Sequence, residues 1–586
     1  MLRCLLKLAV PALWMLPCAA AQPELVLAGG ALGICSSMSV RQCQAPVRSS
    51  LADGRTGSRY RVDDNRISAA TDPILWRESA DFARPAMSVL LVAMKESFGN
   101  RSVEESDVRA YMESHCIESK VGGIERVRTC RRGDPVPWKL LLDDEQATVL
   151  SAIQEFDASG DGERRRERVN LTGSVDAAGV DILKAFRAAS AARADGRPRI
   201  AFVTASGVDN FDAVDFYQAA LSGLDAEVSW WPIDAALHAA VFKGEGCADL
   251  EHTRRLHLKL PARDRVYPDL VQEYERFCSE PDALASLPDQ VDGIFFAGGD
   301  QWRMRRAFFD AADQPNPALQ TLRRAFQQGR LAIGGTSAGM AVQSAASMLS
   351  NGESAMALEG PALRMPPTAF GCTRAGRCER GVPEQALTVW PAGGLGLVPG
   401  MLFDTHFSER AREIRLMRVL SDSGLGLAAG ADEASALLIR LDEGAIQLSA
   451  LGRSGVWLFQ PAESADASDC LQARAHYLVP GRLFNWQDDK LMPAPEGTDD
   501  FDAQSNTGHA TGRVGKSGSA LDDGAMRAAV QALRPGRTTS LSAGKDRQVT
   551  LSADSSSEHW RSPNGLIGRT NLAITLRSSR STACPK

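Results

Sequence analysis

One serine lies in a pentapeptide whose composition suits nucleophilic catalysis. Residues 331–339 read LAIGGTSAG, so Ser337 follows a short apolar run and lies between Gly335 and Gly339 in a GxSxG pattern. Small neighbours allow such a serine to occupy a sharp turn between a strand and a helix, where its hydroxyl reaches the edge of a sheet. Glycine-rich turns without any catalytic role share this pattern. Ser337 is therefore a candidate nucleophile that needs a base and an oxyanion hole nearby.

Two backbone amides are candidates for that oxyanion hole. Ala338 begins the helical pattern after the serine, and amides at a helix N-terminus point toward an anion. The apolar run VDGIFFAGGD (291–300) ends in a double glycine whose second residue is Gly299. In a parallel sheet this loop faces the same edge as Ser337, so we expect Gly299 and Ala338 to donate to the oxyanion. A double glycine alone is most often a tight turn.

The expected general base is His406. The chain has eight histidines, and the other seven lie in charged, surface-like or linker contexts. His406 instead follows an apolar run and precedes a helical pattern in GLGLVPGMLFDTHFSERAREIR (394–415), which places it at the end of a strand. A lone histidine is more often structural, so this interpretation depends on Ser337 lying at the same edge.

The acid that orients the histidine is open between three residues. Glu353 lies in SNGESA, shortly after the serine and its helix, and Asp432 and Glu433 lie in GADEASALL. Position favours Glu353 slightly, so the expected triad is Ser337, His406 and Glu353.

Charged residues flank the histidine on both sides. Asp404 precedes it, and Arg410, Arg412 and Arg415 follow it. Three closely spaced arginines are usually a solvated helix face. Beside a nucleophile they would instead bind carboxylates in a bidentate manner, which predicts an acidic or polyamide substrate.

The elements that must position these residues alternate between strands and helices. Apolar runs such as RPRIAFVTAS (197–206) and AEVSWWPID (226–234) are separated by amphipathic helical patterns. This alternation predicts an α/β fold with a mostly parallel sheet flanked by helices, whose ligands lie at the carboxyl ends of the strands. After about residue 425 the pattern changes to short β-like runs.

The same patterns suggest a domain organisation. ELVLAGG (24–30) is expected to be the first strand of the sheet, which favours an insertion over a separate module for the stretch that follows it. The predicted units are a signal peptide (1–21), the first strand of the catalytic domain (22–30), an insertion or accessory module (31–198), the catalytic domain (199–490), and a linker with a small β-rich C-terminal extension (491–586).

The first residues have the layout of a secretory signal peptide. Arg3 and Lys7 precede an apolar stretch that ends in three alanines, so cleavage is expected after Ala21. An uncleaved anchor is disfavoured because Pro11 and Pro17 interrupt a short stretch. We expect a secreted or periplasmic protein with no membrane contact after cleavage.

Composition narrows the partners and cofactors. The 586 residues carry a formal net charge of −6 without a long basic run, which excludes nucleic acid as an expected partner. Beyond the signal peptide the ten cysteines favour disulfides, with Cys35/Cys43, Cys116/Cys130 and Cys372/Cys378 as close pairs. Tight CxxC or His/Cys clusters are missing, so no metal and no cofactor is expected.

With these residues assembled, the chain resembles the cyanophycinase and peptidase E family of serine exopeptidases, whose fold is similar to the class I glutamine amidotransferase α/β domain. The resemblance covers residues 199–480 and rests on motifs that run in the order of the family: AFVTAS, FFAGGDQ, IGGTSAGM, GLGLVPG with DTHFSERAREIR, and GADEASALL. By position it implies Ser337 as nucleophile and His406 as base. It also implies a substrate pocket lined by Gln301, Asp404, Arg410, Arg412 and Arg415, with Thr405 where the family typically has glutamine.

The resemblance implies an exported serine peptidase that hydrolyses a peptide or isopeptide polymer such as cyanophycin through an acyl-enzyme. Thr405, and Met340 in place of the usual alanine, leave the substrate open. One alternative is a catalytically silent member that serves as a secreted binding module. Another is a serine esterase, which would leave GGDQ and the arginines unexplained. A homodimer is compatible with the added regions.

Overall fold

The computed structural model describes residues 22–76, 83–119, 125–442, 444–462, 470–495 and 518–578. The expected signal peptide, residues 1–21, lies outside the described residues, as does the stretch 496–517 of the expected linker. Within these ranges no helix combines the length and the apolar character that a membrane crossing requires.

A nine-stranded sheet organises the molecule, in the order β20-β19-β16-β15-β1-β9-β8-β6-β7. Its parallel half consists of β1 (Glu24–Ala28), β9 (Ala332–Thr336), β8 (Gly293–Phe296), β6 (Arg199–Val203) and β7 (Glu227–Trp230). Its antiparallel half consists of β15 (Ser435–Asp442), β16 (Ala445–Gly452), β19 (Leu483–Gln487) and β20 (Lys490–Pro493).

The predicted α/β arrangement with flanking helices is confirmed, but the sheet is mixed rather than mostly parallel. The β-like runs after residue 425 supply the difference, because β15 pairs with β1 and extends the same sheet in the antiparallel sense. Strand β1 lies where the two halves meet, and Leu25, Val26 and Leu27 are all buried. A continuous apolar run of this kind suits a strand that is covered on both faces.

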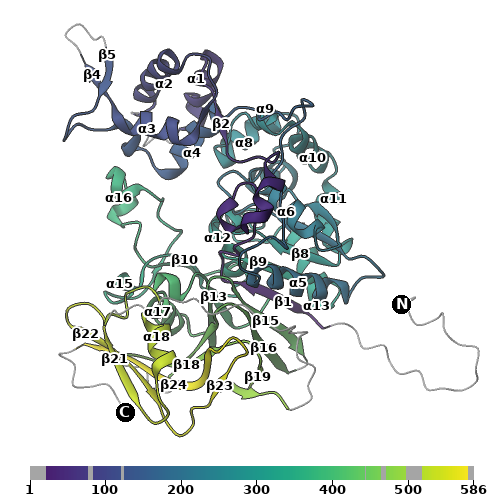
Figure 1. Ribbon diagram of the computed structural model, residues 1–586, viewed down its shortest axis with the longest axis vertical. Helices are drawn as coiled ribbons and strands as arrows, with labels where there is room; N and C mark the ends of the chain where they lie inside the picture. The colour runs from purple at the N-terminus through teal and green to yellow at the C-terminus, as the bar shows by residue number, and fades with distance from the viewer. Residues whose placement is uncertain are drawn as a thin grey trace, which may run out of the picture.

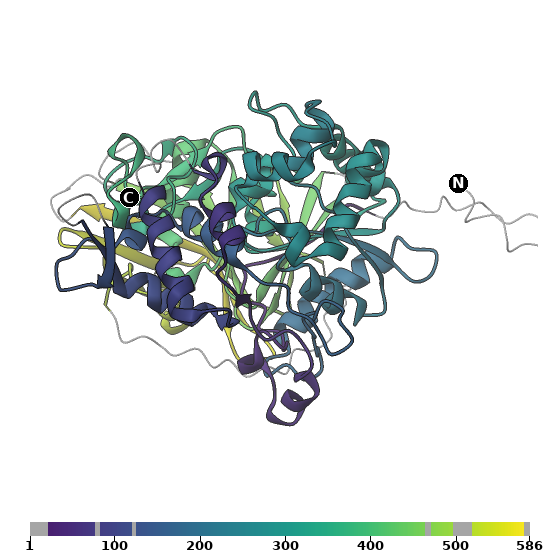
Figure 2. The same cartoon turned by 90° about the horizontal axis from the view of Figure 1, so that it is seen from above.

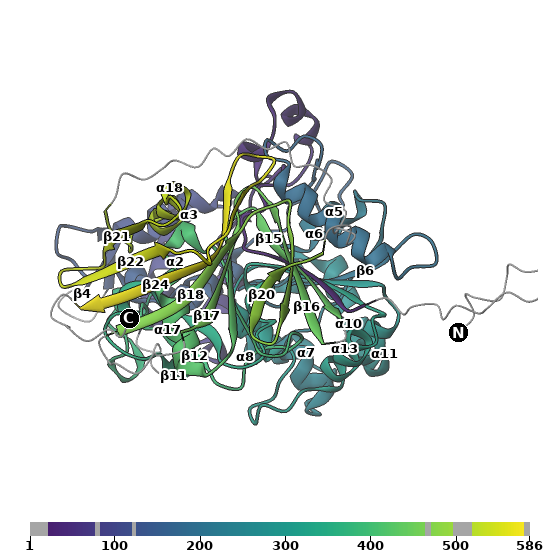
Figure 3. The ribbon, with the colours of Figure 1, turned by 90° about the horizontal axis from the view of Figure 1, so that it is seen from below.

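Helices cover the parallel half on both sides. Helix α5 (Ala178–Ala191) packs against β1, β8 and β9, and α6 (Val214–Ser222) packs against β6 and β7. Figure 3 shows α5 and α6 on one side of the sheet, with α10 (Pro268–Ser279) and α13 (Pro317–Gln327) on the other. The buried strands and these helices share one hydrophobic core.

A second, eight-stranded sheet lies beside the first (Figure 1). Its order is β13-β14-β17-β18-β24-β22-β21, with β23 paired to β24. The strands before residue 490 are β13 (Met401–Asp404), β14 (Leu427–Ala431), β17 (Val456–Pro461) and β18 (Cys470–Leu478). The strands after it are β21 (Thr538–Ser542), β22 (Arg547–Ala553), β23 (His559–Arg561) and β24 (Ile567–Ser578). Because β24 pairs with β18 along its length, the C-terminal strands continue a sheet that begins with the strand before His406.

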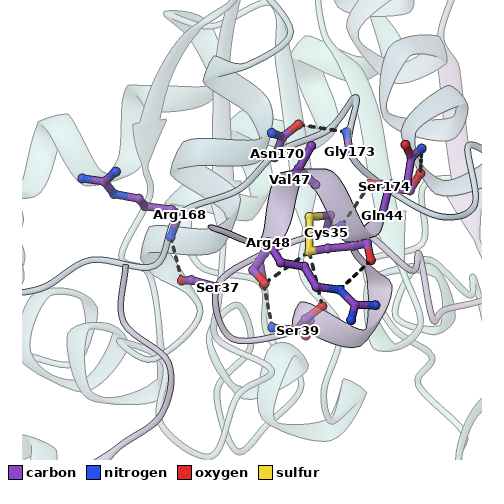
Figure 4. The surroundings of a disulfide bond; sticks show 12 residues. Cys35, Ser37, Ser39, Gln44, Val47, Arg48, Arg168, Asn170, Gly173 and Ser174 are labelled. Carbon is purple, nitrogen blue, oxygen red and sulfur yellow. Dashed lines mark hydrogen bonds between the residues drawn. A yellow bond between two sulfur atoms is a disulfide. The ribbon is translucent and has the colours of Figure 1, made fainter. Parts of the chain in front are cut away.

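The stretch between β1 and α5 leaves the sheet and returns to it. Near its start, Cys35 and Cys43 form a disulfide, and the Cys35 amide donates to Ser174 Oγ at 3.0 Å (Figure 4). The Gln44 side chain donates to the Ser174 carbonyl at 2.9 Å. The outgoing and returning segments are therefore tied together beside the disulfide.

We call residues 59–153 the helical module. Its helices are α1 (Asp64–Ala70), α2 (Arg84–Phe98), α3 (Glu105–Ser114) and α4 (Asp143–Ile153), and its short strands are β2 (Arg59–Tyr60), β3 (Val103–Glu104), β4 (His115–Ser119) and β5 (Glu125–Thr129). These elements enclose a hydrophobic core of their own, which includes Leu91, Met112 and Trp138. Seen from above, the module lies beside the helices of the large sheet (Figure 2).

The three close cysteine pairs expected from the sequence are confirmed as disulfides. A fourth disulfide joins Cys247 to Cys278, which are 31 residues apart and which spacing alone did not pair. Cys470 is disulfide-bonded as well.

Candidate active site

Ser337 occupies a strained turn at the end of β9. Its φ of 53° and ψ of −117° lie outside the regions that side-chain-bearing residues prefer. The Ser337 amide donates to the Ala28 carbonyl at 2.9 Å, which ties the turn to the end of β1. A Cβ on Gly339 would overlap the Phe296 carbonyl, and one on Gly335 would be 2.5 Å from the Gly339 carbonyl oxygen. Both glycines of the pentapeptide are thus required by close backbone approach.

His406 faces this serine from the end of β13. Its Nε2 lies 2.8 Å from Ser337 Oγ. The His406 amide donates to the Gly29 carbonyl at 2.7 Å, and the imidazole lies so close to Gly30 that a Cβ there would overlap the ring. The double glycine at the end of β1 was visible in the sequence, but its contact with a residue 376 positions later follows only from the fold.

Glu433, not Glu353, is the acid beside the histidine. Glu433 Oε1 lies 2.8 Å from His406 Nδ1. Because a carboxylate only accepts hydrogen bonds, this partner assigns the proton of the neutral ring to Nδ1 and leaves Nε2 to accept from the serine hydroxyl. The exposed Glu353 precedes the short helix α15 (Ser354–Ala357), and its amide donates to the Gln385 carbonyl.

Strand pairing explains why Glu433 arrives at this position. Strands β13 and β14 are parallel and in register, with Asp404 opposite Gly430, so the segments after both strands emerge at one edge. The hydrogen bond from His406 lowers the pKa of Glu433, and the charges of Arg410 and Arg453 lower it further. Glu433 is therefore ionised at neutral pH.

The two residues expected to form the oxyanion hole are Ala338, which follows the serine directly, and Gly299, in the loop between β8 and α12 (Gln301–Arg306). Ala338 is the first residue of α14 (Ala338–Ala341), where amides have no carbonyl partner within the helix. Gly299 has a φ of 147°, a conformation that favours glycine, and a Cβ on it would overlap the Ser206 carbonyl. The neighbouring Gly298 approaches Ser337 so closely that a Cβ on it would be 3.4 Å from the serine Cβ.

Two of the residues expected to line the substrate pocket form a buried ion pair instead. Asp404 accepts from Arg415 Nε at 2.8 Å and from Arg415 Nη2 at 2.6 Å, and Arg415 Nη1 also donates to the Gly352 carbonyl. Both side chains are buried. Burial alone would raise the pKa of Asp404, but Arg415 and Arg412 outweigh it and hold that pKa below its ordinary value. The pair secures the end of β13 and leaves neither group exposed to a substrate.

The other expected pocket residues differ in exposure. Arg412 is half-buried and donates from Nη1 to the carbonyl of the buried Thr405 at 2.6 Å. Burial, together with Arg415, lowers the pKa of Arg412 to about 9. Gln301, the first residue of α12 (Gln301–Arg306), donates to the Leu349 carbonyl at 2.8 Å. Arg410 is exposed, and within the described residues its guanidinium makes no hydrogen bond.

The helical module contacts α12 and the loop of residues 372–378. Asp144 of α4 pairs with Arg303 of α12 at 2.5 Å. Glu145 pairs with Arg377 at 2.6 Å, in the loop closed by the disulfide of α16 (Cys372–Ala375), which lies below the module in Figure 1. Ion pairs thus hold the module to α12, which begins at Gln301, and to the loop closed by the Cys372–Cys378 disulfide.

The chain is similar in sequence to several known proteins. No protein-family model matches the chain. The cyanophycinase of Synechococcus elongatus is 28% identical over 227 residues, which cover 37% of this chain and 60% of the relative. The cyanophycinase of Geminocystis herdmanii is 28% identical over 208 residues, which cover 35% of this chain and 57% of that protein.

The cyanophycinase of Trichormus variabilis is 27% identical over 234 residues, covering 38% of this chain and 66% of the relative. The chain thus spans about 60% of the length of the first curated relatives it matches. A solved peptidase from an acI-B1 actinobacterium aligns over 54% of this chain and 91% of its own, with 14% identity and a TM-score of 0.28, a value too low to establish a shared fold. These sequence relatives show that the chain is related to the cyanophycinase family of peptidases.

Proposed function

We propose that the protein is an exported serine-type peptidase that hydrolyses a peptide or isopeptide polymer such as cyanophycin. The observation that carries this proposal is the line of two 2.8 Å contacts from Ser337 through His406 to Glu433, at a strained turn beside two glycine-rich loops. The cyanophycinases among its relatives support the substrate class. A fold of the class I glutamine amidotransferase type is part of the same proposal.

The proposed mechanism is acyl transfer. His406 takes the proton of Ser337 as Oγ attacks an amide carbonyl, and the ionised Glu433 stabilises the imidazolium that forms. The amides of Gly299 and Ala338 donate to the oxyanion. His406 then protonates the leaving amine. In the second half of the reaction His406 takes a proton from water, which attacks the acyl-enzyme, and the proton returns to Ser337 as the acyl group leaves. The 2.8 Å contacts of His406 with Ser337 and with Glu433 support the proton transfers in this scheme.

Substrate recognition is proposed to use Arg410. It is exposed, and its charge acts on Glu433, so it lies near the reacting groups without a competing hydrogen bond within the described residues. A guanidinium at this position suits a carboxylate of an acidic or polyamide substrate. Export is supported by the disulfides, which are typical of oxidising compartments.

A serine-reactive fluorophosphonate tests the catalytic machinery. Wild-type protein should be labelled and Ser337→Ala should not. Glu433→Gln should slow labelling by about 10³- to 10⁴-fold, because the amide no longer holds the required tautomer. Glu353→Gln is the matched control and should label within about twofold of wild type, since Glu353 is exposed and the carboxylate on His406 Nδ1 is that of Glu433. Folded wild-type protein that resists labelling would favour a silent binding module.

Product analysis tests the substrate class. Release of dipeptides from cyanophycin should be compared with hydrolysis of aspartyl and isoaspartyl dipeptides and of simple esters. Turnover of the polymer that is lost in Ser337→Ala supports the proposal. Turnover of esters alone would favour the esterase alternative.

A further inference from the structure

Arg527, from the C-terminal segment (518–578), contacts acidic residues on the two loops that carry His406 and Glu433. Arg527 is the third residue of α18 (Ala525–Ala532), far outside the region that resembles known peptidases. Its Nη1 donates to Glu409 Oε1, to Asp432 Oδ2 at 2.9 Å and to Ser454 Oγ at 3.4 Å. Asp432 is fully buried, and the Arg527 and Glu409 side chains are only 19% and 20% exposed.

Both carboxylates bound by Arg527 also hold the backbone of the triad loops. Glu409 Oε2 accepts from the Glu433 amide at 3.0 Å. Asp432 Oδ1 accepts from the amide of Ser408, two residues after the histidine, also at 3.0 Å. Arg527 therefore joins the loop that carries His406 to the loop that carries Glu433, through one guanidinium.

Three further hydrogen bonds fix this junction. The Gly524 amide, just before α18, donates to the Ser408 carbonyl at 2.6 Å. The Tyr477 hydroxyl donates to Asp432 Oδ2 at 2.9 Å. The Trp457 indole donates to Ser408 Oγ at 3.1 Å. With its partners in place, Asp432 is a fully hydrogen-bonded buried carboxylate, which is the condition under which a buried charge is tolerated.

Without Arg527, negative charge would predominate around this junction. The carboxylates of Glu409 and Asp432 both lie against Arg527, and burial raises the pKa of the neighbouring Glu413 to about 8. Arg410 and Arg453 act on Glu433 from its other side. Burial and Asp432 raise the pKa of Glu409, and Arg527 opposes that rise. Among the described residues, Arg527 is the cation whose guanidinium donates to both Glu409 and Asp432.

We propose that Arg527 is a positioning residue for His406 and Glu433, so that the C-terminal segment completes the active site from behind without touching substrate. This inference rests on the proposed function. Loss of the guanidinium leaves two poorly solvated carboxylates facing each other, and their repulsion moves the Glu433 and Ser408 amides that they hold. The added negative potential also favours the protonated histidine, which cannot accept from Ser337.

The test uses the full chain and three substitutions. Arg527→Met removes the charge, Arg527→Lys keeps it without the forked geometry, and Arg534→Met is the control, since Arg534 is exposed just beyond α18. The rate of fluorophosphonate labelling at Ser337 is measured against pH. Arg527→Met should slow labelling at least about tenfold at pH 7 and move the acid limb of the profile to higher pH. Arg527→Lys should restore part of the rate, and Arg534→Met should match wild type.

Peptide turnover supplies a second readout. A positioning residue that does not touch substrate should lower kcat and leave KM within about twofold. If Arg527→Met does not fold, Glu409→Gln tests the same link, because it weakens both the ion pair with Arg527 and the acceptor of the Glu433 amide. Wild-type rates and pH profiles in both Arg527→Lys and Glu409→Gln, or an effect confined to KM, would overturn the inference.

An NMR experiment distinguishes the positioning role of Arg527 from the proposed peptidase activity. The His406 Nδ1 proton, bonded to Glu433, should give a low-field NMR signal that His406→Gln lacks. Arg527→Met or Glu409→Gln should shift or broaden that signal whether or not a substrate is turned over. An unchanged signal would overturn the positioning role. Absent labelling in folded wild-type protein would instead count against the serine peptidase itself.

Discussion

The helical module and the C-terminal segment (518–578) are both additions to the large sheet and its helices, yet they attach in different ways. The module has a separate hydrophobic core, and it meets its neighbours through charged pairs such as Asp144 with Arg303 and Glu145 with Arg377. The C-terminal segment shares one core with β13, β14 and α17 (Glu413–Ser423). The module is therefore a separately packed unit, whereas the C-terminal segment is part of a core shared with the rest of the molecule.

This difference explains why the C-terminal segment, rather than the module, can affect the loop of His406 through side-chain packing. Phe407, next to the candidate base, belongs to the same core as Leu551 and Leu572 of the C-terminal strands. A change in those strands is transmitted through close-packed side chains to the loop of the histidine. Among its described residues the module contributes no side chain to that core, and it is joined to α12 and to the α16 loop by ion pairs.

The largest expected effect comes from paired core truncations. Leu551→Ala and Leu91→Ala each remove a fully buried side chain, and each should lower the free energy of unfolding of its own unit by about 2–5 kcal/mol. Leu551→Ala should also lower the temperature at which Ser337 loses fluorophosphonate labelling. Leu91→Ala should leave that temperature within about 1 °C of wild type, because its core is separate.

Scanning calorimetry combined with labelling after heating checks this pair. We expect a module transition that only Leu91→Ala displaces. Equal displacement of the labelling temperature by both variants would show that the two cores unfold together.

An intermediate effect is expected from Glu413, which lies in the shared region at the start of α17. Burial and Asp432 raise the pKa of Glu413 to about 8, from an ordinary value of 4.5. An acid whose pKa is raised by folding binds its proton more tightly in the folded state, so stability is lost as pH rises from about 5 to about 8.

Glu413→Gln removes that titration. The stability of the variant relative to wild type should therefore rise by about 1.4 kcal/mol per pH unit across this window. Urea unfolding at pH 5, 6.5 and 8 measures the difference. A constant difference across the three pH values would contradict the assignment of a buried, protonated Glu413.

The smallest effect is expected at the edge of the docked module. Arg374 pairs with Asp143 at 2.8 Å, but the two side chains are 39% and 52% exposed. Exposed pairs contribute about 0–1 kcal/mol, so Arg374→Ala should change the module transition by less than about 1 kcal/mol and leave labelling of Ser337 unchanged. Calorimetry in low and high salt measures this. A shift of several kcal/mol would mean that the module is held far more tightly than its surface pairs indicate.

Sequence reasoning reached the parts of the site that depend on local pattern. Ser337 between two glycines, and His406 at the end of an apolar run, could be singled out because a turn at the carboxyl end of a strand has a local signature. The close cysteine pairs belong to the same class, since short loops bring their ends together without help from the fold. The structure brings Ser337 and His406 within 2.8 Å of each other.

The remaining parts depend on which strands become neighbours. Glu433 replaces Glu353 at the histidine because β13 and β14 pair in parallel, and Asp404 is withdrawn from the expected pocket because α17 presents Arg415 to it. Neither relation has a sequence spacing that would reveal it. The mixed sheet likewise follows from β15 joining β1 across more than 400 residues.

The sequence by itself determined the candidate nucleophile, the candidate base, the alternation of strands and helices, and the local disulfides, because each arises from interactions among near neighbours in the chain. Only the tertiary structure decided the acid, the partners of the arginines and the contact between Arg527 and the triad loops. These depend on strand register and on packing between distant segments, where burial and charge pairing select among residues of the same type.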